Sequence, residues 1–391
     1  MAKTYNSYKD SGIAWIGEIP SEWKVSRYKF YTTNRMGETI LASDTTDVGI
    51  PIYSATQDDS IFGYIQNPKV ILKKGDIVIP ARGNSIGYAT QIKDEIATCS
   101  QTTICSTNIH GINSRFLFYC IYGLKDDWFR YDGSAIPQIT VDQVKNNVLP
   151  LPSKQEQHSI ASFLDTKCGE IDSLISLQEE MISELQAYKQ SVITEAVTKG
   201  LDPNAKMKDS GVEWIGEIPE GWNLSRAKFL VEITHGTDPR TDGDIPVYGS
   251  GAGSFKTCGE YKEGDAVLIG RKGATLNIPH YIVGKYWNVD TAFDVKAKNC
   301  FSLRYYYYLA FCFDYKKYMS QTTLPGMTQS DYNNMTLPFP PLNIQKSIAT
   351  YLDSKTSQID SLISLKQQKI DELKDYKKSI IYEYVTGKKR V

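Results

Sequence analysis

Aliphatic residues recur at helical spacing in two long stretches of the chain. Residues 165–198 contain no proline, and their large aliphatic side chains are separated by steps of three, four and seven. The tail, residues 353–391, repeats the pattern in the same phase. These positions are Ile171, Ile175, Ile182, Leu185, Val192, Ile359, Ile363, Ile370, Leu373 and Ile380. Such spacing forms the seam of a coiled coil, so these ten residues are the predicted helix–helix spacer.

A single amphipathic helix on a domain surface would show a similar pattern. However, about 34 residues at about 1.5 Å each span roughly 50 Å, more than a domain of this size. Residues 165–205 carry 3 basic and 8 acidic side chains, whereas residues 353–391 carry 9 and 6. These opposite net charges favour pairing of the two helices with one another.

The connection between the helices predicts their direction. Gly200, Pro203 and Asn204 end the first helix, and a globular segment follows at once. We therefore expect antiparallel helices, with two globular heads at opposite ends of a rod and a pseudo-two-fold axis between them.

The segments outside the helices contain short apolar runs bounded by turn residues, which is typical of strands. Residues 77–80 and 266–270 each follow Gly-Asp and precede a basic loop that contains glycine. The aromatic-rich residues 114–131 and 302–319 predict some helix within each range. In the second range, the tyrosines at 305–308 could stack on the bases of a nucleic acid. The preferred interpretation is a helix that buries its aromatic face. Both segments are therefore expected to be mixed α/β.

Proline-containing residues 149–152 and 337–341 mark the exits from the globular segments, because proline interrupts a strand ladder. Ser153 and Glu156 follow at the spacing of a capping box, which predicts a helix start. The second copy offers Asn343 as a cap but lacks the acidic partner.

Two motifs occur twice in the chain. Residues 10–20 (Asp-Ser-Gly-Ile-Ala-Trp-Ile-Gly-Glu-Ile-Pro) return almost unchanged at 209–219, and residues 171–177 (Ile-Asp-Ser-Leu-Ile-Ser-Leu) return at 359–365. Two tandem units thus share their edges and differ in their middles. The predicted domains are globular residues 1–150, helix and linker 151–205, globular residues 206–338 and helix 339–391. A scaffold that occurs twice with different middle segments indicates a recognition protein with two specificities rather than an enzyme with one catalytic centre.

Composition excludes several other classes of protein. The net charge of −1 over 391 residues argues against a protein that simply coats DNA, which would be strongly basic. No apolar run approaches eighteen residues, and seven scattered cysteines without a Cys-x-x-Cys pair indicate free thiols in the cytoplasm. We find no nucleotide-binding loop, no methylation motif, no metal-ligand cluster and no catalytic constellation, so neither an enzyme nor a membrane protein is expected.

The loops after the two predicted strands carry the chemistry that reads duplex DNA. Arginine can pair bidentately with guanine, and asparagine or glutamine with adenine, while hydroxyls hold phosphate. Both repeats place an arginine in this loop, and the loops then diverge. The candidate DNA-binding residues of the first segment are Arg82, Asn84, Ser85, Gln57, Gln101, Thr102 and Gln138. Those of the second segment are Arg271, Lys272, Thr275, Lys256, Asn288, Thr291 and Gln329.

Together these features resemble the specificity (S, HsdS) subunit of a type I restriction-modification system. The resemblance rests on the repeated motif at 10–23 and 209–222, and on Gly-Asp-x-Val at 75–78 and 264–267. It also rests on residues 150–165 (Pro-Leu-Pro-x-x-x-Glu-Gln-x-x-Ile-x-x-x-Leu-Asp) and on the Ile-Asp-x-Leu-Ile helices. One departure is Ile344-Gln345, where the first repeat has Glu156-Gln157.

The resemblance implies two target recognition domains, each reading one half of an asymmetric bipartite DNA sequence. The long helices would set the spacer and dock two methyltransferase subunits, and restriction subunits would complete the complex. S-adenosylmethionine, ATP and Mg²⁺ would be held by those partners in the cytoplasm of a bacterium or archaeon, and the chain itself would be catalytically inert. The alternative is a scaffold whose two heads bind proteins rather than DNA.

Overall fold

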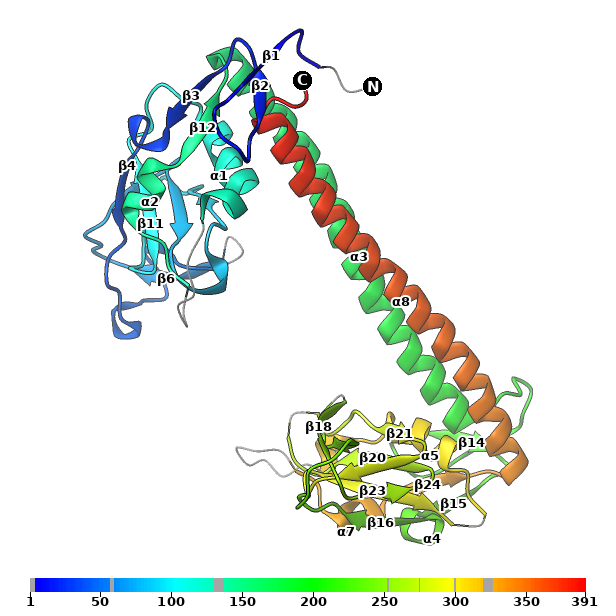
Figure 1. Ribbon diagram of the computed structural model, residues 1–391. Coiled ribbons are helices and arrows are strands. Elements are labelled where there is room, and N and C mark those ends of the chain that lie inside the picture. The colour runs from blue at the N-terminus through cyan, green and yellow to red at the C-terminus, as the bar shows by residue number, and fades with distance from the viewer. Residues whose placement is uncertain are drawn as a thin grey trace. The chain divides into compact units, whose positions relative to one another are not determined.

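The computed structural model describes residues 4–56, 60–129, 137–251, 253–273, 275–298, 300–318 and 326–391. The chain divides into two compact units, of which the first comprises Met1–Gln178 with Gln368–Val391 and the second Glu179–Gln367. Each unit contains a mixed α/β head and part of both long helices, α3 (Lys154–Lys199) and α8 (Leu342–Val385) (Figure 1). We call the part of the first unit before α3 the first head, and the part of the second unit between α3 and α8 the second head.

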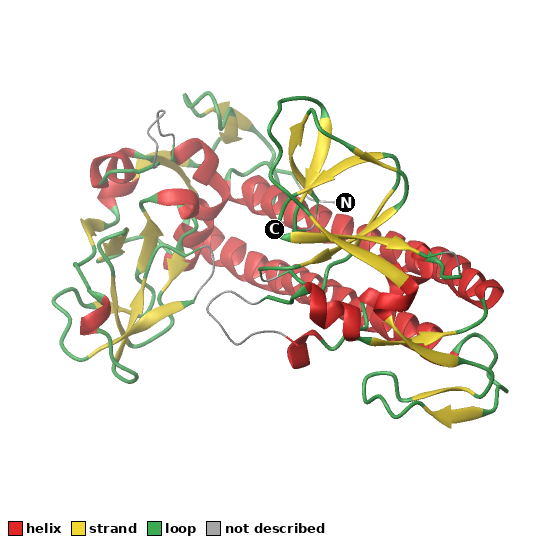
Figure 2. Ribbon diagram, turned by 90° about the horizontal axis from the view of Figure 1, so that it is seen from below, coloured by secondary structure: helices red, strands yellow, loops and turns green. Residues whose placement is uncertain are grey.

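The first head is built from short strands with two α-helices. Figure 2 colours the strands and helices of the chain separately. Its strands are β1 (Tyr8–Asp10), β2 (Glu18–Pro20), β3 (Lys24–Arg27), β4 (Thr33–Met36), β5 (Ile50–Tyr53), β6 (Ile61–Ile65), β7 (Leu72–Lys73), β8 (Ile77–Pro80), β9 (Thr90–Gln91), β10 (Ile96–Cys99), β11 (Thr103–Thr107) and β12 (Val148–Leu151). Its helices are α1 (Ser114–Trp128) and α2 (Val141–Asn146), with short 3₁₀ turns at Tyr28–Phe30, Ala42–Asp44 and Gly83–Ser85. Two four-stranded sheets have the orders β6-β5-β10-β7 and β4-β11-β8-β9, and the pairs β1-β2 and β12-β3 complete the head.

The second head repeats this plan strand for strand. Its strands are β13 (Met207–Asp209), β14 (Glu217–Pro219), β15 (Asn223–Arg226), β16 (Val231–His235), β17 (Ile245–Tyr248), β18 (Ser254–Cys258), β19 (Lys262–Glu263), β20 (Ala266–Gly270), β21 (His280–Ile282), β22 (Lys285–Asn288), β23 (Ala292–Ala297) and β24 (Thr336–Phe339). Its helices are α4 (Ala227–Leu230), α5 (Leu303–Ala310), α6 (Tyr315–Tyr318) and α7 (Gln329–Asn334). The sheet orders β18-β17-β22-β19 and β16-β23-β20-β21 match those of the first head position for position. The strands predicted at 77–80 and 266–270 are confirmed as β8 and β20.

The core of the first unit is made by segments far apart in the sequence. Helix α1 turns Phe116, Ile121 and Leu124 into a cluster that also contains Ile381 and Val385 of α8, all of them with no exposed surface. Burying such a side chain contributes about 1.5–3 kcal/mol. The approach of α1 to α8 is close, since a Cβ placed on Gly123 would lie 2.8 Å from Cγ2 of Ile381. The C-terminal end of the chain is therefore a structural part of the first unit.

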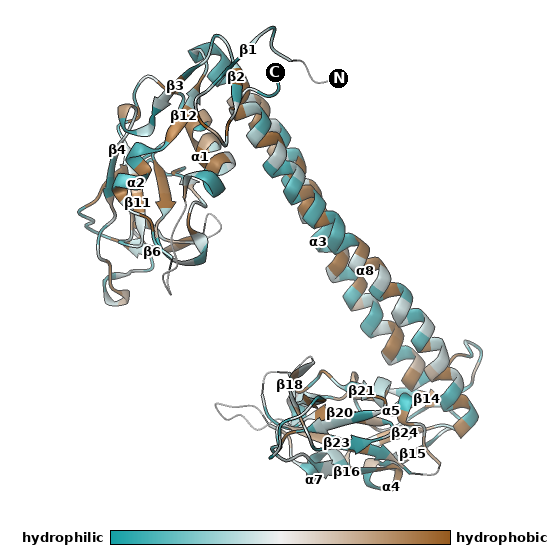
Figure 3. Ribbon diagram, viewed as in Figure 1, coloured by the Kyte–Doolittle hydropathy of each residue, from teal (hydrophilic) through white to brown (hydrophobic). Residues whose placement is uncertain are grey.

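The two long helices pair in an antiparallel sense within each unit. In the first unit Lys377 near the end of α8 bonds Asp172 of α3, with both Nζ–O distances 2.7 Å. In the second unit Lys189 late in α3 bonds Asp360 of α8 at the same distances. All ten predicted seam residues are buried or half-buried, and apolar residues recur along both helices (Figure 3). The predicted fold class, tandem mixed α/β domains with two long helices, is confirmed.

Several local predictions can be compared with the structure. The capping box before α3 is confirmed, because the amide of Glu156 donates to Oγ of Ser153 and the amide of Ser153 donates back to the Glu156 carboxylate, both at 3.3 Å. Asn343 is not a cap, because α8 already begins at Leu342 and its first amides donate to the carbonyl of Pro341. The Pro341 carbonyl therefore starts the second helix without a side-chain cap.

The helix predicted within 302–319 is confirmed as α5 and α6, but it is not continuous. It is interrupted after α5, where the amide of Cys312 bonds the carbonyl of Leu309 in a tighter turn. Phe313 is buried just beyond this break, in the apolar cluster of the second unit. Tyr305, Tyr306 and Tyr308 of α5 are buried, so the interpretation of a buried aromatic face is confirmed.

Candidate nucleic-acid interface

Three segments of the first head meet at one edge of the sheet β4-β11-β8-β9. Strands β8 and β11 are antiparallel, so the loop after β8 and the turn before β11 lie at the same edge. The amide of Ala81 donates to the carbonyl of Thr102, and the amide of Ile139 donates to the carbonyl of Ala81, both at 2.9 Å. Arg82 and Gln138 form an antiparallel bridge. The structure thus brings Arg82, Thr102 and Gln138 together from positions about 20 and 56 residues apart.

The side chains at this edge differ in their solvent exposure and in the contacts that they make within the protein. Arg82 and Gln138 are exposed, and within the described ranges the guanidinium of Arg82 has no ion-pair or hydrogen-bond partner. Gln101 is exposed, and its Oε1 accepts a hydrogen bond from the hydroxyl of Thr39 at 2.9 Å. The Thr102 hydroxyl lies 2.7 Å from the hydroxyl of Ser100. Arg82 and Gln138 therefore have the greatest freedom to contact a ligand.

Two other candidates stand close to Arg82 in the sequence but differ in exposure. Asn84 is exposed and already has an interaction within the protein. Ser85 is buried, and its hydroxyl donates to the carbonyl of Ala55 at 2.9 Å, so it holds the loop rather than faces solvent. Gln57 lies outside the described residues.

The second head assembles the equivalent edge from equivalent segments. The amide of Arg271 donates to the carbonyl of Thr291 at 2.8 Å, and the amide of Met327 donates to the carbonyl of Arg271 at 2.9 Å. Lys272 bridges Gly326. A pocket of about 650 Å³ opens here, and its lining includes Arg271, Lys272, Gln329 and His235.

The arginine of the second head is more restrained than Arg82. The guanidinium of Arg271 donates to the carbonyl and the carboxylate of Asp290, at 3.0 and 3.1 Å. The Lys272 ammonium lies 3.8 Å from the same carboxylate. Gln329 donates from its amide to the carbonyl of Ile233, which leaves its Oε1 as the available acceptor. The two edges thus share a backbone plan but present different side-chain chemistry.

Three other candidates of the second head are buried, bonded within the protein or placed on the other four-stranded sheet. Asn288 is fully buried, and its amide donates to the carbonyl of Ala292 while its oxygen accepts from Lys262, so it presents nothing to a base. Thr275 donates its hydroxyl to the carbonyl of Ser250 at 2.6 Å. Lys256 is exposed on β18, in the other four-stranded sheet.

Two kinds of residue were missed by the reasoning from sequence. His235 at the end of β16 lines the pocket of the second head, and its ring centroid lies 4.9 Å from that of Phe293. Phe62 on β6 and Phe255 on β18, at equivalent places in the two heads, are 53% and 60% exposed. In the sequence, these phenylalanines could have been found only as aromatic residues within short strands. In the structure, each strand lies at the edge of its sheet.

Two features are absent from the described residues. Among them no group of three His, Cys, Asp or Glu side chains is arranged to hold a metal ion, and all seven cysteines are free. Across the same described ranges, no helix combines the length and the apolar character needed to cross a membrane.

Comparison with known proteins places the chain in a family. A family model described as the type I restriction modification DNA specificity domain matches residues 20–187 and again 219–375. The type I restriction enzyme MjaVIII specificity subunit of Methanocaldococcus jannaschii is 25% identical over 421 residues, covering 95% of this chain and 94% of that protein. The putative MjaX specificity subunit of the same organism is also 25% identical, covering 96% of each.

A solved structure supports the fold. A chain from a study of complex assembly and conformational transition in the type I R-M system is 16% identical, with a TM-score of 0.70 over 94% of this chain and 98% of that chain. The chain therefore belongs to the family of type I restriction-modification DNA specificity domains, of which it carries two. It is the specificity subunit of such a system, a non-catalytic component that carries no catalytic cofactor of its own. Membership of this family implies duplex DNA as the ligand and a complex with modification and restriction subunits.

Proposed function

We propose that each head reads one half of an asymmetric bipartite DNA target through the edge described above. The observation that carries this proposal is the repeated assembly of the same three segments with different side chains. A shared backbone plan suits two ligands of one kind, and unlike side chains suit two different base sequences.

The chemistry of each edge indicates how it would read bases. In the first head the free guanidinium of Arg82 can pair bidentately with O6 and N7 of guanine, and Gln138 beside it can pair with adenine. In the second head Arg271 is held by Asp290, so its fork is oriented in advance, while Lys272 and the Oε1 of Gln329 add a cation and an acceptor. Neither Ser85 nor Asn288 is part of this proposal, because both side chains are buried.

The long helices would hold the two heads at a set spacing and dock two methyltransferase subunits, with restriction subunits completing the complex. Those partners would bind S-adenosylmethionine, ATP and Mg²⁺. This division of labour agrees with the net charge of −1, because partners that enclose the duplex would supply most of the phosphate contacts.

The test is selection from a pool of random DNA duplexes by this chain assembled with its methyltransferase partner. We expect two short conserved blocks separated by a constant number of unspecified base pairs. Mapping methylated adenines in the source organism with and without the chain should return the same two blocks. Uniform recovery of the pool, or one continuous block, would contradict the proposal.

A further inference from the structure

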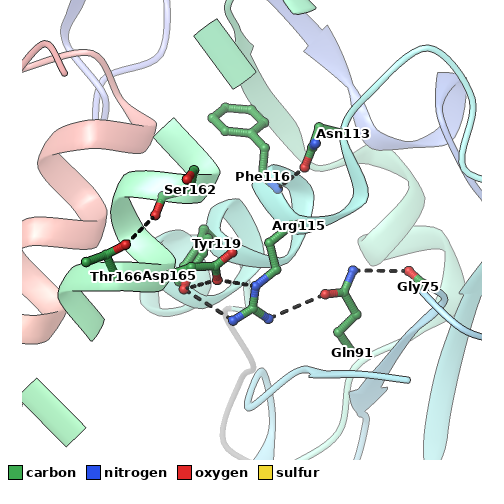
Figure 4. A network of polar contacts seen from close by, with 9 residues as sticks. All are labelled: Gly75, Gln91, Asn113, Arg115, Phe116, Tyr119, Ser162, Asp165 and Thr166. Atoms are coloured by element: carbon green, nitrogen blue, oxygen red, sulfur yellow. Dashed lines mark hydrogen bonds and ion pairs between the residues drawn. The ribbon is translucent and has the colours of Figure 1, made fainter. Parts of the chain in front are cut away.

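A polar network recurs in both units and is explained by the fold. In the first unit it joins α1 to α3, where Nε of Arg115 lies 2.5 Å from Oδ1 of Asp165 (Figure 4). In the second unit it joins α5 to α8, where Nε of Arg304 donates to Oδ1 of Asp353 at 2.7 Å. Both guanidinium groups are paired within the protein, so this network attaches each head to a long helix.

An exposed phenylalanine also recurs in both heads. Phe62 on β6 and Phe255 on β18 are 53% and 60% exposed. Each is the extra residue of a β-bulge, because the residues on either side of it pair with consecutive residues of the neighbouring strand. Bulges aim a side chain away from its regular direction in the sheet. The neighbouring residues differ, Ile-Phe-Gly against Ser-Phe-Lys, so the phenylalanine is kept where its surroundings have diverged.

No contact within the protein accounts for this ring in both heads. The ammonium of Lys256 lies 5.6 Å from the centroid of the Phe255 ring, but Gly63 takes the place of Lys256 in the first head. The exposure of the two rings shows that packing in a core does not require them either. An exposed apolar side chain on an edge strand favours unwanted strand pairing. Its occurrence in both heads therefore indicates a ligand.

The strand opposite each bulge is bonded to the edge where the candidate DNA-binding residues meet, which we call the reading edge. Tyr53 and Tyr248 are the residues at which the strand register shifts. The amide of Ser100 donates to the carbonyl of Tyr53 at 2.9 Å, and the amide of Val289 donates to the carbonyl of Tyr248 at 3.0 Å. Each donor belongs to the turn that supplies a threonine to the reading edge.

The basic loop of each head is bonded to the same hairpin. The hydroxyl of Ser85 donates to the carbonyl of Ala55 at 2.9 Å, and the hydroxyl of Thr275 donates to the carbonyl of Ser250 at 2.6 Å. Both acceptors lie two residues beyond the tyrosine opposite the bulge. The hairpin that carries the phenylalanine is thus fixed to the reading edge in the same way in both heads.

In the second head the ring itself is a neighbour of the reading edge. A Cβ placed on Gly249 would lie 3.6 Å from Cε1 of Phe255 and 2.8 Å from Oγ1 of Thr291. The carbonyl of Thr291 accepts the amide of Arg271. The phenyl ring and the backbone of the loop arginine therefore lie on the two sides of one threonine.

The groove that this edge reads determines what the ring can contact. Arginine and glutamine would read the O6, N7 and N6 atoms of purines, which lie in the major groove. The methyl group that base pairs present in this groove is the C5-methyl of thymine. A phenyl ring neither donates nor accepts a conventional hydrogen bond, so apolar contact with this methyl is the base recognition open to it.

We propose that Phe62 and Phe255 are specificity-determining residues, each of which contacts the C5-methyl of a thymine in the half-target of its own head. This role rests on the proposed function and requires an A·T pair in each half-target. It adds an apolar contact to the polar contacts of the reading edge.

The experiment uses the full chain assembled with its methyltransferase partner, on the DNA target that selection returns. Each thymine of the two half-targets, in either strand, is replaced in turn by uracil, which keeps its base pair and loses only the methyl. We expect one replacement in each half to raise the Kd roughly fourfold, as for the loss of one buried methyl-sized group. Phe62→Ala should abolish this effect in one half only, and Phe255→Ala should abolish it in the other half only.

The chain offers two matched controls. Phe30 and Phe229 are 66% and 62% exposed, and both belong to the stretch Ser-Arg-x-Lys-Phe that the two units share. Phe30→Ala and Phe229→Ala should keep the effect of uracil in both halves. Each effect is a ratio of two Kd values measured on one protein, so a smaller folded fraction in a variant cancels.

The outcomes separate this inference from the proposed function. If the wild-type complex selects no bipartite sequence, the proposed function fails and the thymine contacts fail with it. If two blocks are selected, but one contains no A·T pair or uracil acts equally on the wild type and on the Phe62 and Phe255 variants, only the thymine contacts are refuted. Equal weakening of Phe62→Ala on all sequences, without dependence on the methyl, would identify the ring as a wedge between base steps and overturn the proposal.

Discussion

The two loop arginines lie one backbone position apart, because Arg271 makes the backbone bonds of Ala81 and Lys272 takes the bridging place of Arg82, and they also differ in their freedom. Arg82 is exposed without a partner among the described residues, whereas Arg271 is bound by Asp290. A free guanidinium loses more conformational entropy when it binds a base, but it can also adapt to the groove. The two arginines are therefore expected to tolerate substitution differently.

Replacing Arg82 with alanine should weaken binding by about 1–3 kcal/mol and relax the preference at one base position of one half-target. The loss follows from the removal of a bidentate pair with guanine. Binding to a library of single-base variants, measured in the assembled complex, tests this expectation, and Arg271→Ala should relax the other half instead. Equal weakening on all sequences would identify Arg82 as a phosphate contact.

Glu38 gives the stability of the first head a dependence on pH. Its carboxylate accepts bonds from the amides of Lys69 and Val70, both at 3.0 Å, and from the hydroxyl of Thr98 at 2.8 Å. Burial alone would raise the pKa of Glu38, but these bonds outweigh burial and lower it. A carboxyl whose pKa is lower in the folded state contributes stability above its unfolded pKa of about 4.3, and loses it as pH falls through the folded value.

Glu38→Gln should therefore be less stable than the wild type at pH 7, and the difference should shrink as the pH falls below about 4. Urea unfolding of both proteins at several pH values measures the difference. Glu22→Gln, at an exposed position of the same head, is the matched control. A difference that grows on acidification would have the wrong sign for this explanation.

At the scale of elements, each long helix ends in a glycine that contacts a repeated tryptophan. Gly200 after α3 has φ +79°, and a Cβ there would lie 3.0 Å from the ring of Trp222. Gly387 after α8 has φ +73°, and a Cβ there would lie 2.4 Å from Cδ of Pro20 and 3.1 Å from the Trp23 ring. Two causes together require glycine at such a site: the left-handed backbone conformation, and the close approach of a neighbouring ring to the place of a Cβ.

Gly387→Ala should destabilise the first unit by more than the roughly 1–2 kcal/mol that a left-handed alanine costs. Gly12→Ala separates the two causes, because Gly12 has φ +71° but a Cβ there would have no neighbouring atom within 4 Å. We expect the Gly387 variant to unfold at lower urea concentration than the Gly12 variant. Equal destabilisation would mean that the ring of Pro20 moves aside at little cost.

The sequence predicts elements well where the signal is local. The ten seam residues, the capping box at Ser153 and the strand at 77–80 each follow from spacing within a few residues. The break between α5 and α6 was missed, because it depends on the packing of Phe313 into the apolar cluster rather than on a local breaker. The capping role assigned to Asn343 failed for a similar reason, since the carbonyl of Pro341 already accepts the first amides of α8.

The candidate site could be predicted only in part. The loop arginines were found because both repeats place one after a strand. The bridge between Arg82 and Gln138 spans 56 residues, and the bond between Arg115 and Asp165 spans 50, so neither follows from spacing along the chain. Asn288 was chosen for its amide, yet the parallel pairing of β17 with β22 places it in the interior.

At the scale of the whole molecule, the two units have separate apolar cores. The first core is formed by the first head, the start of α3 and the end of α8, and the second by the second head, the end of α3 and the start of α8. Each head therefore depends on both helices but on no residue of the other head's core. This separation allows one head to be changed while the other keeps its structure.

Exchange of residues 24–148 for those of a relative should change one half of the recognised sequence and leave the other half intact. The exchanged segment begins with β3 and ends at the first residue of β12, and these two strands pair with each other. In the chimera, the foreign β3 must therefore pair with the rest of the native β12. The exchanged α1 must also pack against Ile381 and Val385 of the native α8. Because α8 lies close to Gly123, a relative with a small residue at this position is the better donor. Selection from random duplexes measures both halves in one experiment, and loss of both would show that the heads do not read DNA independently.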